Sequence, residues 1–185
     1  MSQSTSDSGQ WLERFRPYLT LLARAHLGGC GGRVDASDVV QQTLLNAFAK
    51  RTQYRGSTDA ELAAWLRQIL KHNLIDAARA ERREKRDVRR ELSLEGDIEG
   101  AFSRADQGLI SVQSSPSQKI LRQEELLRLA EGLTKLPEAQ REAIVLHHLQ
   151  ERKLAEVAAE MGRSEAAVAG LLYRGLKALH QLLGE

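Results

Sequence analysis

The feature that most constrains the fold of this chain is a pair of helical patterns near its C-terminus, separated by a three-residue turn. A short pattern runs from Leu154 to Met161, and a longer one with apolar residues at three- to four-residue spacing follows. Between them lies Gly162-Arg163-Ser164, where glycine permits a tight turn and Ser164 can cap the second helix. The positions expected to face inward are Leu154, Val157, Ala158, Met161, Val168, Leu171, Leu172 and Leu179. This pattern is typical of a helix-turn-helix, whose second helix enters the major groove of DNA.

The rest of the chain favours an all-α fold. Leu, Ala, Glu and Arg dominate, aromatic residues make up 4%, and only three prolines are present. No apolar run approaches the roughly 18 residues of a membrane span, so no membrane insertion is expected. Residues 1–10 are polar without a secretion-signal pattern, and Cys30, the single cysteine, has no partner for an internal disulfide. We therefore expect a cytoplasmic protein.

Hydrophobic periodicity predicts two small helical domains. Helices are expected over 11–22, ended by the glycine cluster at 28–32, over 35–50, and over 60–90 after a break and N-cap at 56–59. Residues 93–118 lose this periodicity and indicate a flexible linker. Helical patterns return around Leu126–Leu133 and after Leu136-Pro137-Glu138. The predicted organisation is a disordered tail over 1–10, a first domain over 11–92, the linker, and a second domain over 119–185.

Charge is concentrated in the first domain. The whole chain carries a net charge of +2, but residues 1–92 hold 16 Lys and Arg against 11 Asp and Glu. Most of the excess lies between Lys71 and Arg90, on the longest predicted helix. Such a distribution is expected for a segment that contacts a polyanion, although a charged run is as often a solvated helix face.

Three motifs together resemble the extracytoplasmic-function (ECF) group of sigma-70-type RNA polymerase sigma factors. The first is Asp35-Ala36-Ser37-Asp38-Val39-Val40-Gln41-Gln42-Thr43, which is similar to the polymerase-binding segment of that group. The second is Tyr54-Arg55-Gly56-Ser57 followed by Trp65-Leu66-Arg67 and Asn73-Leu74-Ile75-Asp76, which resembles the promoter-melting segment. The third is the stretch 136–179, which resembles the C-terminal helix-turn-helix domain. The resemblance implies that 11–92 is sigma region 2 and 119–185 is sigma region 4.

The resemblance also implies partners. Core RNA polymerase would be bound through its clamp helices and flap, promoter DNA would be recognised and opened, and an anti-sigma factor is a further candidate partner. The polymerase contact falls on the helix face opposite the apolar stripe, where a helix-on-helix contact needs short polar side chains and one leucine. Its residues are Asp38, Gln41, Gln42 and Leu45.

For the −10 promoter element, the family resemblance implies a loop and the following helix that together hold a flipped base of the non-template strand. The candidate residues are Tyr54, Arg55, Gly56, Ser57, Gln68, Lys71, His72, Asn73, Arg79, Arg82 and Arg83. Family members commonly have Asn where this chain has His72, and Asn73 comes next. A helical wheel turns Asn73 inward and His72 outward, so both stay candidates for the base contact. The arginines are expected to hold phosphates without reading sequence.

For the −35 element, the second helix of the helix-turn-helix supplies the candidate residues. They are Arg163, Ser164, Ala166, Ala169, Gly170, Tyr173, Arg174 and Lys177. Relatives commonly carry a basic residue where Ala169 stands and a small polar one at Gly170. Shape and phosphate contacts are therefore expected to outweigh base-edge hydrogen bonds here.

No catalytic residue, metal or cofactor is predicted. We find no nucleophile–base pair or phosphate loop, and the adjacent His147 and His148 would point about 100° apart on a helix. A redox role for Cys30 is not indicated.

Three other classes of protein are alternatives: a free-standing helix-turn-helix regulator, a recombinase, and a protein-interaction module that sequesters another factor. The first leaves the Asp38 motif unused, and the second needs an α/β domain for which strand patterns are lacking.

Overall fold

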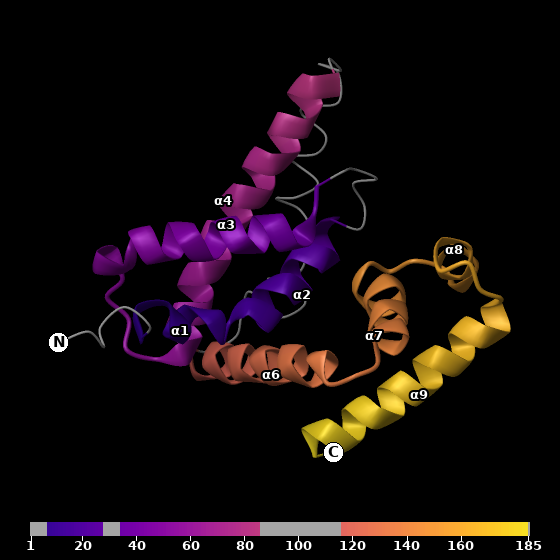
Figure 1. Ribbon diagram of the computed structural model, residues 1–185. Coiled ribbons are helices and arrows are strands. Elements are labelled where there is room, and N and C mark those ends of the chain that lie inside the picture. The colour runs from indigo at the N-terminus through magenta and orange to yellow at the C-terminus, as the bar shows by residue number, and fades with distance from the viewer. Residues whose placement is uncertain (1–6, 28–33, 86–115, 185) are drawn as a thin grey trace. The chain divides into compact units, whose positions relative to one another are not determined.

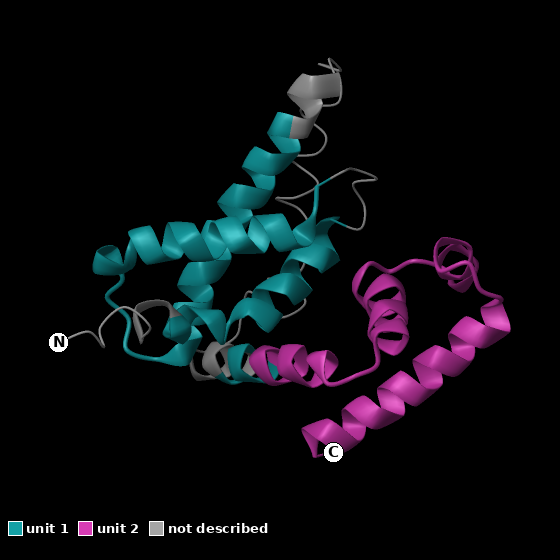
Figure 2. Ribbon diagram, in the orientation of Figure 1, with its two compact units in different colours: residues 1–125 teal, residues 126–185 magenta. Residues whose placement is uncertain are grey.

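The computed structural model describes residues 7–27, 34–85 and 116–184. The chain divides into two compact units, residues 1–125 and residues 126–185, and each is described by itself (Figures 1 and 2). Every regular element in the described ranges is a helix, which confirms the predicted all-α class. None of the described helices has the length and apolar character that a membrane span requires.

The first unit is built around three helices packed through apolar faces. Its elements are α1 (Asp7–Glu13), α2 (Arg16–Leu27), α3 (Ala36–Ala49), the short 3-10 turn η1 (Arg51–Gln53) and α4 (Asp59–Lys85). α3 packs against α2 and α4, and α1 also contacts α3 (Figure 1). The largest side chains with almost no exposure are Leu12, Phe15, Tyr18, Leu19, Leu66, Leu70 and Leu74. Burial of these apolar groups is the main stabilising contribution to the unit.

The helix predicted over 11–22 is not continuous, which corrects that prediction. α1 ends at Glu13, the Phe15 amide donates to the Leu12 carbonyl at 3.0 Å, and α2 begins at Arg16. Pro17 in the first turn of α2 explains the break, because proline has no amide hydrogen to continue a preceding helix. The apolar stripe continues across the break, so one periodic pattern spans two separate helices.

α3 and α4 begin where their caps predict. Asp35 caps α3 by accepting hydrogen bonds from the Ser37 amide and hydroxyl, both at 2.8 Å. α4 begins at Asp59, directly after the predicted break at 56–59, and is described as far as Lys85. The last part of the predicted helix, 86–90, lies outside the described residues, as do residues 93–115 of the predicted linker. Residues 116–118 of that linker begin α6 (Pro116–Thr134), which crosses the boundary between the two units.

The second unit contains the helix-turn-helix that the sequence predicts. After α6 come α7 (Glu138–Ile144), the π-helical turn η3 (Val145–Leu149), α8 (Leu154–Glu160) and α9 (Glu165–Leu183). Gly162 has φ +60°, a left-handed conformation that glycine adopts at little cost. The Ser164 hydroxyl accepts a hydrogen bond from the Ala167 amide at 3.2 Å and caps α9. α9 packs against α7 and α8. Of the predicted inward positions, Leu154 and Met161 are half-buried, and the others are buried: Val157, Ala158, Val168, Leu171, Leu172 and Leu179.

Candidate functional site

The predicted polymerase-binding residues share the exposed face of α3. Asp38, Gln41 and Gln42 are exposed, and Leu45 is 54% exposed despite its apolar side chain. Gln41 accepts a hydrogen bond from Arg16 at 2.8 Å, and Gln42 donates one to Asn46 at 2.9 Å. The opposite face is buried against the other helices of the unit through Val39, Val40, Thr43, Leu44 and Ala47. α3 therefore has an exposed polar face that carries one leucine, the composition expected of a helix-on-helix contact.

An open groove of about 600 Å³ lies between this face of α3 and the middle of α4. Its polar lining includes the carboxylates of Asp35, Asp38 and Asp76. The exposed face of α3 thus continues into a negatively charged groove, which suits a partner with basic side chains.

Asn73 lies inside the unit and joins the two helices. Its amide nitrogen donates to Thr43 Oγ1 at 2.9 Å, and its oxygen accepts from the Asn46 amide at 2.9 Å. Thr43 is fully buried and donates in turn to the Val39 carbonyl at 2.7 Å. His72, by contrast, is exposed, with its Nδ1 2.6 Å from the Gln68 carbonyl. The two neighbouring residues therefore differ in orientation as the helical wheel predicts. Sequence reasoning missed the partners Thr43 and Asn46.

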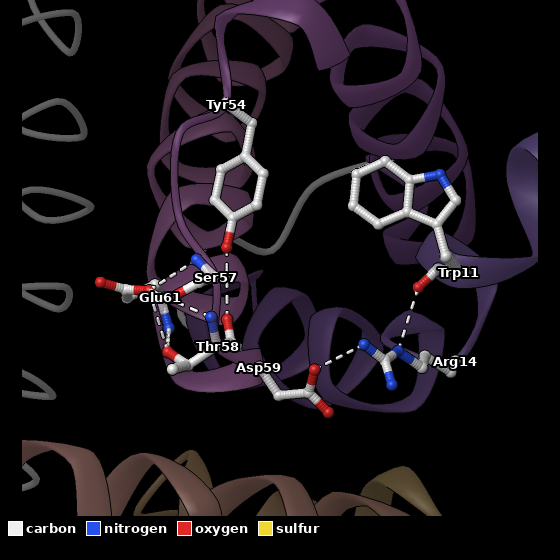
Figure 3. A network of polar contacts seen from close by, with 7 residues as sticks. All are labelled: Trp11, Arg14, Tyr54, Ser57, Thr58, Asp59 and Glu61. Carbon is white, nitrogen blue, oxygen red and sulfur yellow. Dashed lines mark hydrogen bonds and ion pairs between the residues drawn. The ribbon is translucent and has the colours of Figure 1, made fainter.

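The loop before α4 folds around the Tyr54 ring (Figure 3). The ring centroid lies 5.2 Å from that of Trp65 and 6.4 Å from that of Trp11, and the hydroxyl donates to the Thr58 carbonyl at 3.2 Å. A Cβ on Gly56 would lie 2.3 Å from the Tyr54 hydroxyl oxygen, so the ring covers this glycine. Burial, followed by the nearby Glu61 and Asp59 carboxylates, raises the pKa of Tyr54. Of the four predicted loop residues, Arg55 and Ser57 are exposed while Tyr54 and Gly56 are half-buried.

Glu61 holds the end of this loop through a capping box at the start of α4. One of its carboxylate oxygens accepts from the Ser57 amide at 2.8 Å, the Thr58 amide at 3.0 Å and the Thr58 hydroxyl at 3.1 Å. The Thr58 hydroxyl accepts from the Glu61 amide at 3.2 Å. The backbone hydrogen bonds from Ser57 and Thr58 lower the pKa of Glu61, which keeps the carboxylate ionised. The signal was available in the sequence, because Thr58-Asp59-Ala60-Glu61 matches the capping-box pattern.

Apart from Asn73, which points inward, the predicted DNA-contacting residues of α4 lie on its outer side as far as the structure describes them. Gln68, His72 and Arg79 are exposed and Lys71 is half-buried. Arg79 lies 3.8 Å from Asp76, in an exposed ion pair of small energetic weight. Arg82 and Arg83 lie in the last turns of α4, but their side chains are outside the described residues. This surface offers cations at helical spacing.

The predicted −35 residues form the exposed side of α9 and its N-terminal turn. Tyr173 is 70% exposed, and all the others are exposed except the half-buried Gly170. A Cβ on Gly170 would meet only the Arg174 guanidinium, at 3.3 Å or more. The buried side is made of Val168, Leu171, Leu172, Gly175 and Leu179. The helix thus separates a packed side from an open side that carries small residues, one aromatic ring and two cations.

The histidine pair after α7 packs ring against ring. The rings of His147 and His148 meet edge to face with centroids 4.8 Å apart, and His147 Nδ1 lies 2.8 Å from the Arg152 carbonyl. Burial, with the neighbouring His147, lowers the pKa of His148. Among the described residues no group of three or more His, Cys, Asp and Glu side chains is placed to hold a metal ion. Cys30 lies outside the described residues.

Comparison with known proteins identifies both units. Residues 11–84 match the family described as Sigma-70 region 2, and residues 126–179 match Sigma-70, region 4. The ECF RNA polymerase sigma factor SigF of Caulobacter vibrioides is 30% identical over 149 residues, which cover 80% of this chain and 71% of SigF. The chain belongs to the ECF group of the sigma-70 family. The match to region 2 disfavours a free-standing helix-turn-helix regulator, because it covers the part that such a regulator leaves unexplained.

Two further similar proteins share a lower identity with this sigma factor. The ECF RNA polymerase sigma factor BldN of Streptomyces coelicolor is 28% identical over 155 residues, which cover 83% of this chain but only about half, 52%, of BldN. Among solved structures, the sigma factor RpoE of Bartonella quintana, co-crystallised with the anti-sigma factor NepR, is 21% identical. That match covers 95% of this chain and 97% of RpoE with a TM-score of 0.35. A score that low supports no argument about shape or partners.

Proposed function

We propose that this sigma factor binds core RNA polymerase through the exposed face of α3 and directs the enzyme to promoters. The observation that carries the proposal is the face formed by Asp38, Gln41, Gln42 and the 54% exposed Leu45. Three short polar side chains around one leucine suit a helix-on-helix contact, in which the leucine is covered and the polar groups form the rim. By family membership the partner surface is the clamp helices of the polymerase, and region 4 would bind its flap.

Promoter opening is assigned to the Tyr54–Ser57 loop and the outer side of α4. Unpairing costs on the order of 1 kcal/mol per base-pair step, and capture of an unstacked base offsets that cost. We assign the base contact on α4 to His72, with Gln68 and Lys71 beside it, because His72 is exposed whereas the Asn73 amide already bonds to Thr43 and Asn46. Arg79, with Arg82 and Arg83, would hold phosphates.

Recognition of the −35 element is assigned to α9. The exposed Ala166 and Ala169 and the half-buried Gly170 are small and permit close approach to the major groove, with the exposed Tyr173 beside them. Arg163, Arg174 and Lys177 supply cations for phosphates. Two binding units on one chain raise the effective concentration of each for its half of the promoter, so neither needs to bind tightly alone. We place the protein in the cytoplasm, with an anti-sigma factor as a further partner, and assign it no catalytic residue, cofactor or metal.

Run-off transcription tests the proposal. Core polymerase is incubated with and without this protein on a library of promoter sequences, and transcripts are mapped. The expected result is a set of start sites that require both proteins and share −35 and −10 sequences. Absence of any start site that depends on both would overturn it. Tight binding of the protein alone to a duplex site would instead support a free-standing regulator.

A further inference from the structure

The Tyr54–Ser57 loop is held by residues that the proposed function does not use. They come from two elements: Thr58, Asp59 and Glu61 at the start of α4, and Trp11 and Arg14 at the end of α1 (Figure 3). Contacts from both elements converge on the short segment from Tyr54 to Asp59, which contains the base-capture loop and leads into α4.

The first set of contacts fixes the backbone of the loop. The amides of Ser57 and Thr58 donate to one carboxylate oxygen of Glu61 at 2.8 and 3.0 Å. They are therefore occupied within the protein and are not donors for a DNA phosphate. The Tyr54 hydroxyl reaches the Thr58 carbonyl at 3.2 Å, so the loop is closed from its first residue to the cap of α4.

The second set of contacts ties this closed loop to α1. Arg14 Nη2 lies 2.5 Å from Asp59 Oδ1, across 45 positions of sequence, while its Nε donates to the Trp11 carbonyl at 3.2 Å. The Trp11 ring lies beside the Tyr54 ring, with centroids 6.4 Å apart. Both members of the ion pair are more than half exposed, at 54% and 57%, and exposed pairs contribute little to stability. Their geometric effect is more specific, because Arg14 joins the end of α1 to the first residue of α4.

The same contacts decide which loop side chains face outward. The Tyr54 ring covers Gly56 and packs beside the Trp65 ring. Tyr54 and Gly56 therefore face inward and shape the loop. Arg55 and Ser57 stay exposed. A loop that is already in its binding conformation avoids the entropy loss of ordering it on the DNA strand.

We propose that the α1 end (Trp11, Arg14) and the capping box of α4 (Thr58, Glu61) are positioning residues that hold the Tyr54–Ser57 loop ready for strand capture. The inference rests on the proposed role of this loop in promoter opening. It predicts that loosening either set of contacts weakens opening of duplex DNA and leaves polymerase binding, which uses the face of α3, unchanged.

A matched pair of substitutions at Thr58 tests the capping box. Thr58→Val keeps the size of the side chain but removes the hydroxyl, whereas Thr58→Ser keeps the hydroxyl. Each variant is assembled with core polymerase, and unpaired thymines are measured by permanganate on a duplex promoter and on the same promoter with a mismatched, already open −10 segment. We expect Thr58→Val to open the duplex about fivefold less than Thr58→Ser, as loss of one cap allows. On the open template the two should differ little, because no unpairing is needed.

The α1 contacts are tested with Trp11→Ala against Trp11→Phe under the same conditions. The other member of the capping box is tested with Glu61→Ala against Glu61→Gln. Co-purification with core and thermal melting of each variant show whether polymerase binding and the fold persist. Equal opening by Thr58→Val and Thr58→Ser on the duplex would overturn the inference. An equal deficit on both templates would do the same, because it would show a general loss and no positioning effect.

A second measurement separates this inference from the proposed function. The chain has two tryptophans, Trp11 and Trp65, and both rings lie beside Tyr54. Tryptophan emission of the free protein therefore reports on this cluster without polymerase. We expect Thr58→Val to shift the emission and Thr58→Ser to leave it as in the wild type. If the wild type opens no promoter, the proposed function fails, but the emission shift of Thr58→Val still tests how the loop is held. Identical emission from Thr58→Val and Thr58→Ser would overturn the loop inference itself.

Discussion

The side-chain amide of Asn73 donates a 2.9 Å hydrogen bond to the buried hydroxyl oxygen of Thr43, 30 positions earlier in the chain. This bond joins α4, which carries the proposed base-capture surface, to α3, which carries the proposed polymerase-binding face. Because Asn46 also donates to Asn73, the three side chains form a continuous polar contact between the two helices. The proposed polymerase-binding face and the proposed base-capture surface thus lie on two helices that are joined by side-chain hydrogen bonds.

Replacement by alanine should therefore affect stability at Asn73 and promoter opening at His72. Asn73→Ala removes the partner of the half-buried Asn46 amide and a donor to the buried Thr43 hydroxyl oxygen, so it should lower the free energy of unfolding by about 1–2 kcal/mol. His72→Ala, at an exposed position, should change it by less than about 0.5 kcal/mol but reduce promoter opening. Urea denaturation and permanganate footprinting measure the two effects. A stable Asn73→Ala variant with defective opening would assign the base contact to Asn73 instead.

Charge reversal at Asp38 should abolish binding to core polymerase. Asp38 lies exposed in the first turn of α3, so an arginine there would repel a basic partner and lose only about 0.3–1 kcal/mol of favourable interaction with the helix dipole. Co-purification of Asp38→Arg with core, together with its circular dichroism, is the measurement. Glu124→Arg, an equivalent change at an exposed position of α6, is the control and should still co-purify. Retention of Asp38→Arg by core would contradict the proposed contact.

Two glycines of α9 should give opposite results when replaced by alanine. A Cβ on Gly175 would lie 2.9 Å from Ile144 Cδ1 and 3.2 Å from Gln140 Cβ, so Gly175→Ala should destabilise the protein by about 1–3 kcal/mol. At Gly170 only the flexible Arg174 guanidinium is near, so Gly170→Ala should stabilise by about 0.5–1 kcal/mol through helix propensity. Thermal and urea melting of the two variants check the signs. Equal changes in the free energy of unfolding would mean that Gln140 and Ile144 of α7 move to make room for a methyl group at Gly175.

Stability should fall as the solution is acidified below about pH 4.5. The hydrogen bonds from Ser57 and Thr58 lower the pKa of Glu61 from its ordinary 4.5, those from Ser37 lower the pKa of Asp35 from 3.8, and that from Arg16 lowers the pKa of Glu13. A lowered pKa in the folded state means that the unfolded chain binds more protons in this range. The stabilisation is therefore complete above the unfolded pKa and lost as pH falls through the folded one. Urea midpoints from pH 7 to pH 3 measure it, and the difference between wild type and Glu61→Gln should shrink toward pH 3.

Removal of Arg79 should reduce the salt dependence of promoter binding. A cation that neutralises one phosphate releases about one counterion, so Arg79→Ala should lower the slope of log K against log salt by about 1. The measurement compares promoter affinity of the holoenzyme between low and physiological salt. Arg24→Ala, at an exposed position on α2 that is not among the proposed DNA contacts, should leave the slope unchanged. A slope unaltered by Arg79→Ala would remove this residue from the phosphate contacts.

Much of this fold follows from local patterns in the sequence. The apolar stripes of α3, α4 and α9, the Asp35 and Ser164 caps and the Gly162 turn depend on residues within a turn or two of each other, so spacing alone predicts them. The inward orientation of Asn73 follows from the same helical wheel. The break between α1 and α2 was missed because the stripe continues through it, although Pro17 was a local signal for it.

The loop network could not be predicted in the same way. The Thr58–Glu61 capping box was visible as a short motif, but the contacts of α1 with the loop join residues such as Arg14 and Asp59, which are 45 positions apart. No spacing rule says which two distant side chains will meet, because that depends on how α1 packs on α3. Similarly, the wheel predicts that Asn73 is buried but not that Thr43 and Asn46 bond to it.

The separation of the two sides of α9 has a practical consequence for engineering. Its packed side is buried through Val168, Leu171 and Leu172, while Ala166 and Ala169 are exposed. Side chains with hydrogen-bond donors could therefore be introduced at these two positions without repacking the domain. A library randomised there and selected on altered promoters would yield sigma factors with orthogonal −35 specificity, and a chain that now offers few base-edge donors is a convenient starting template for one.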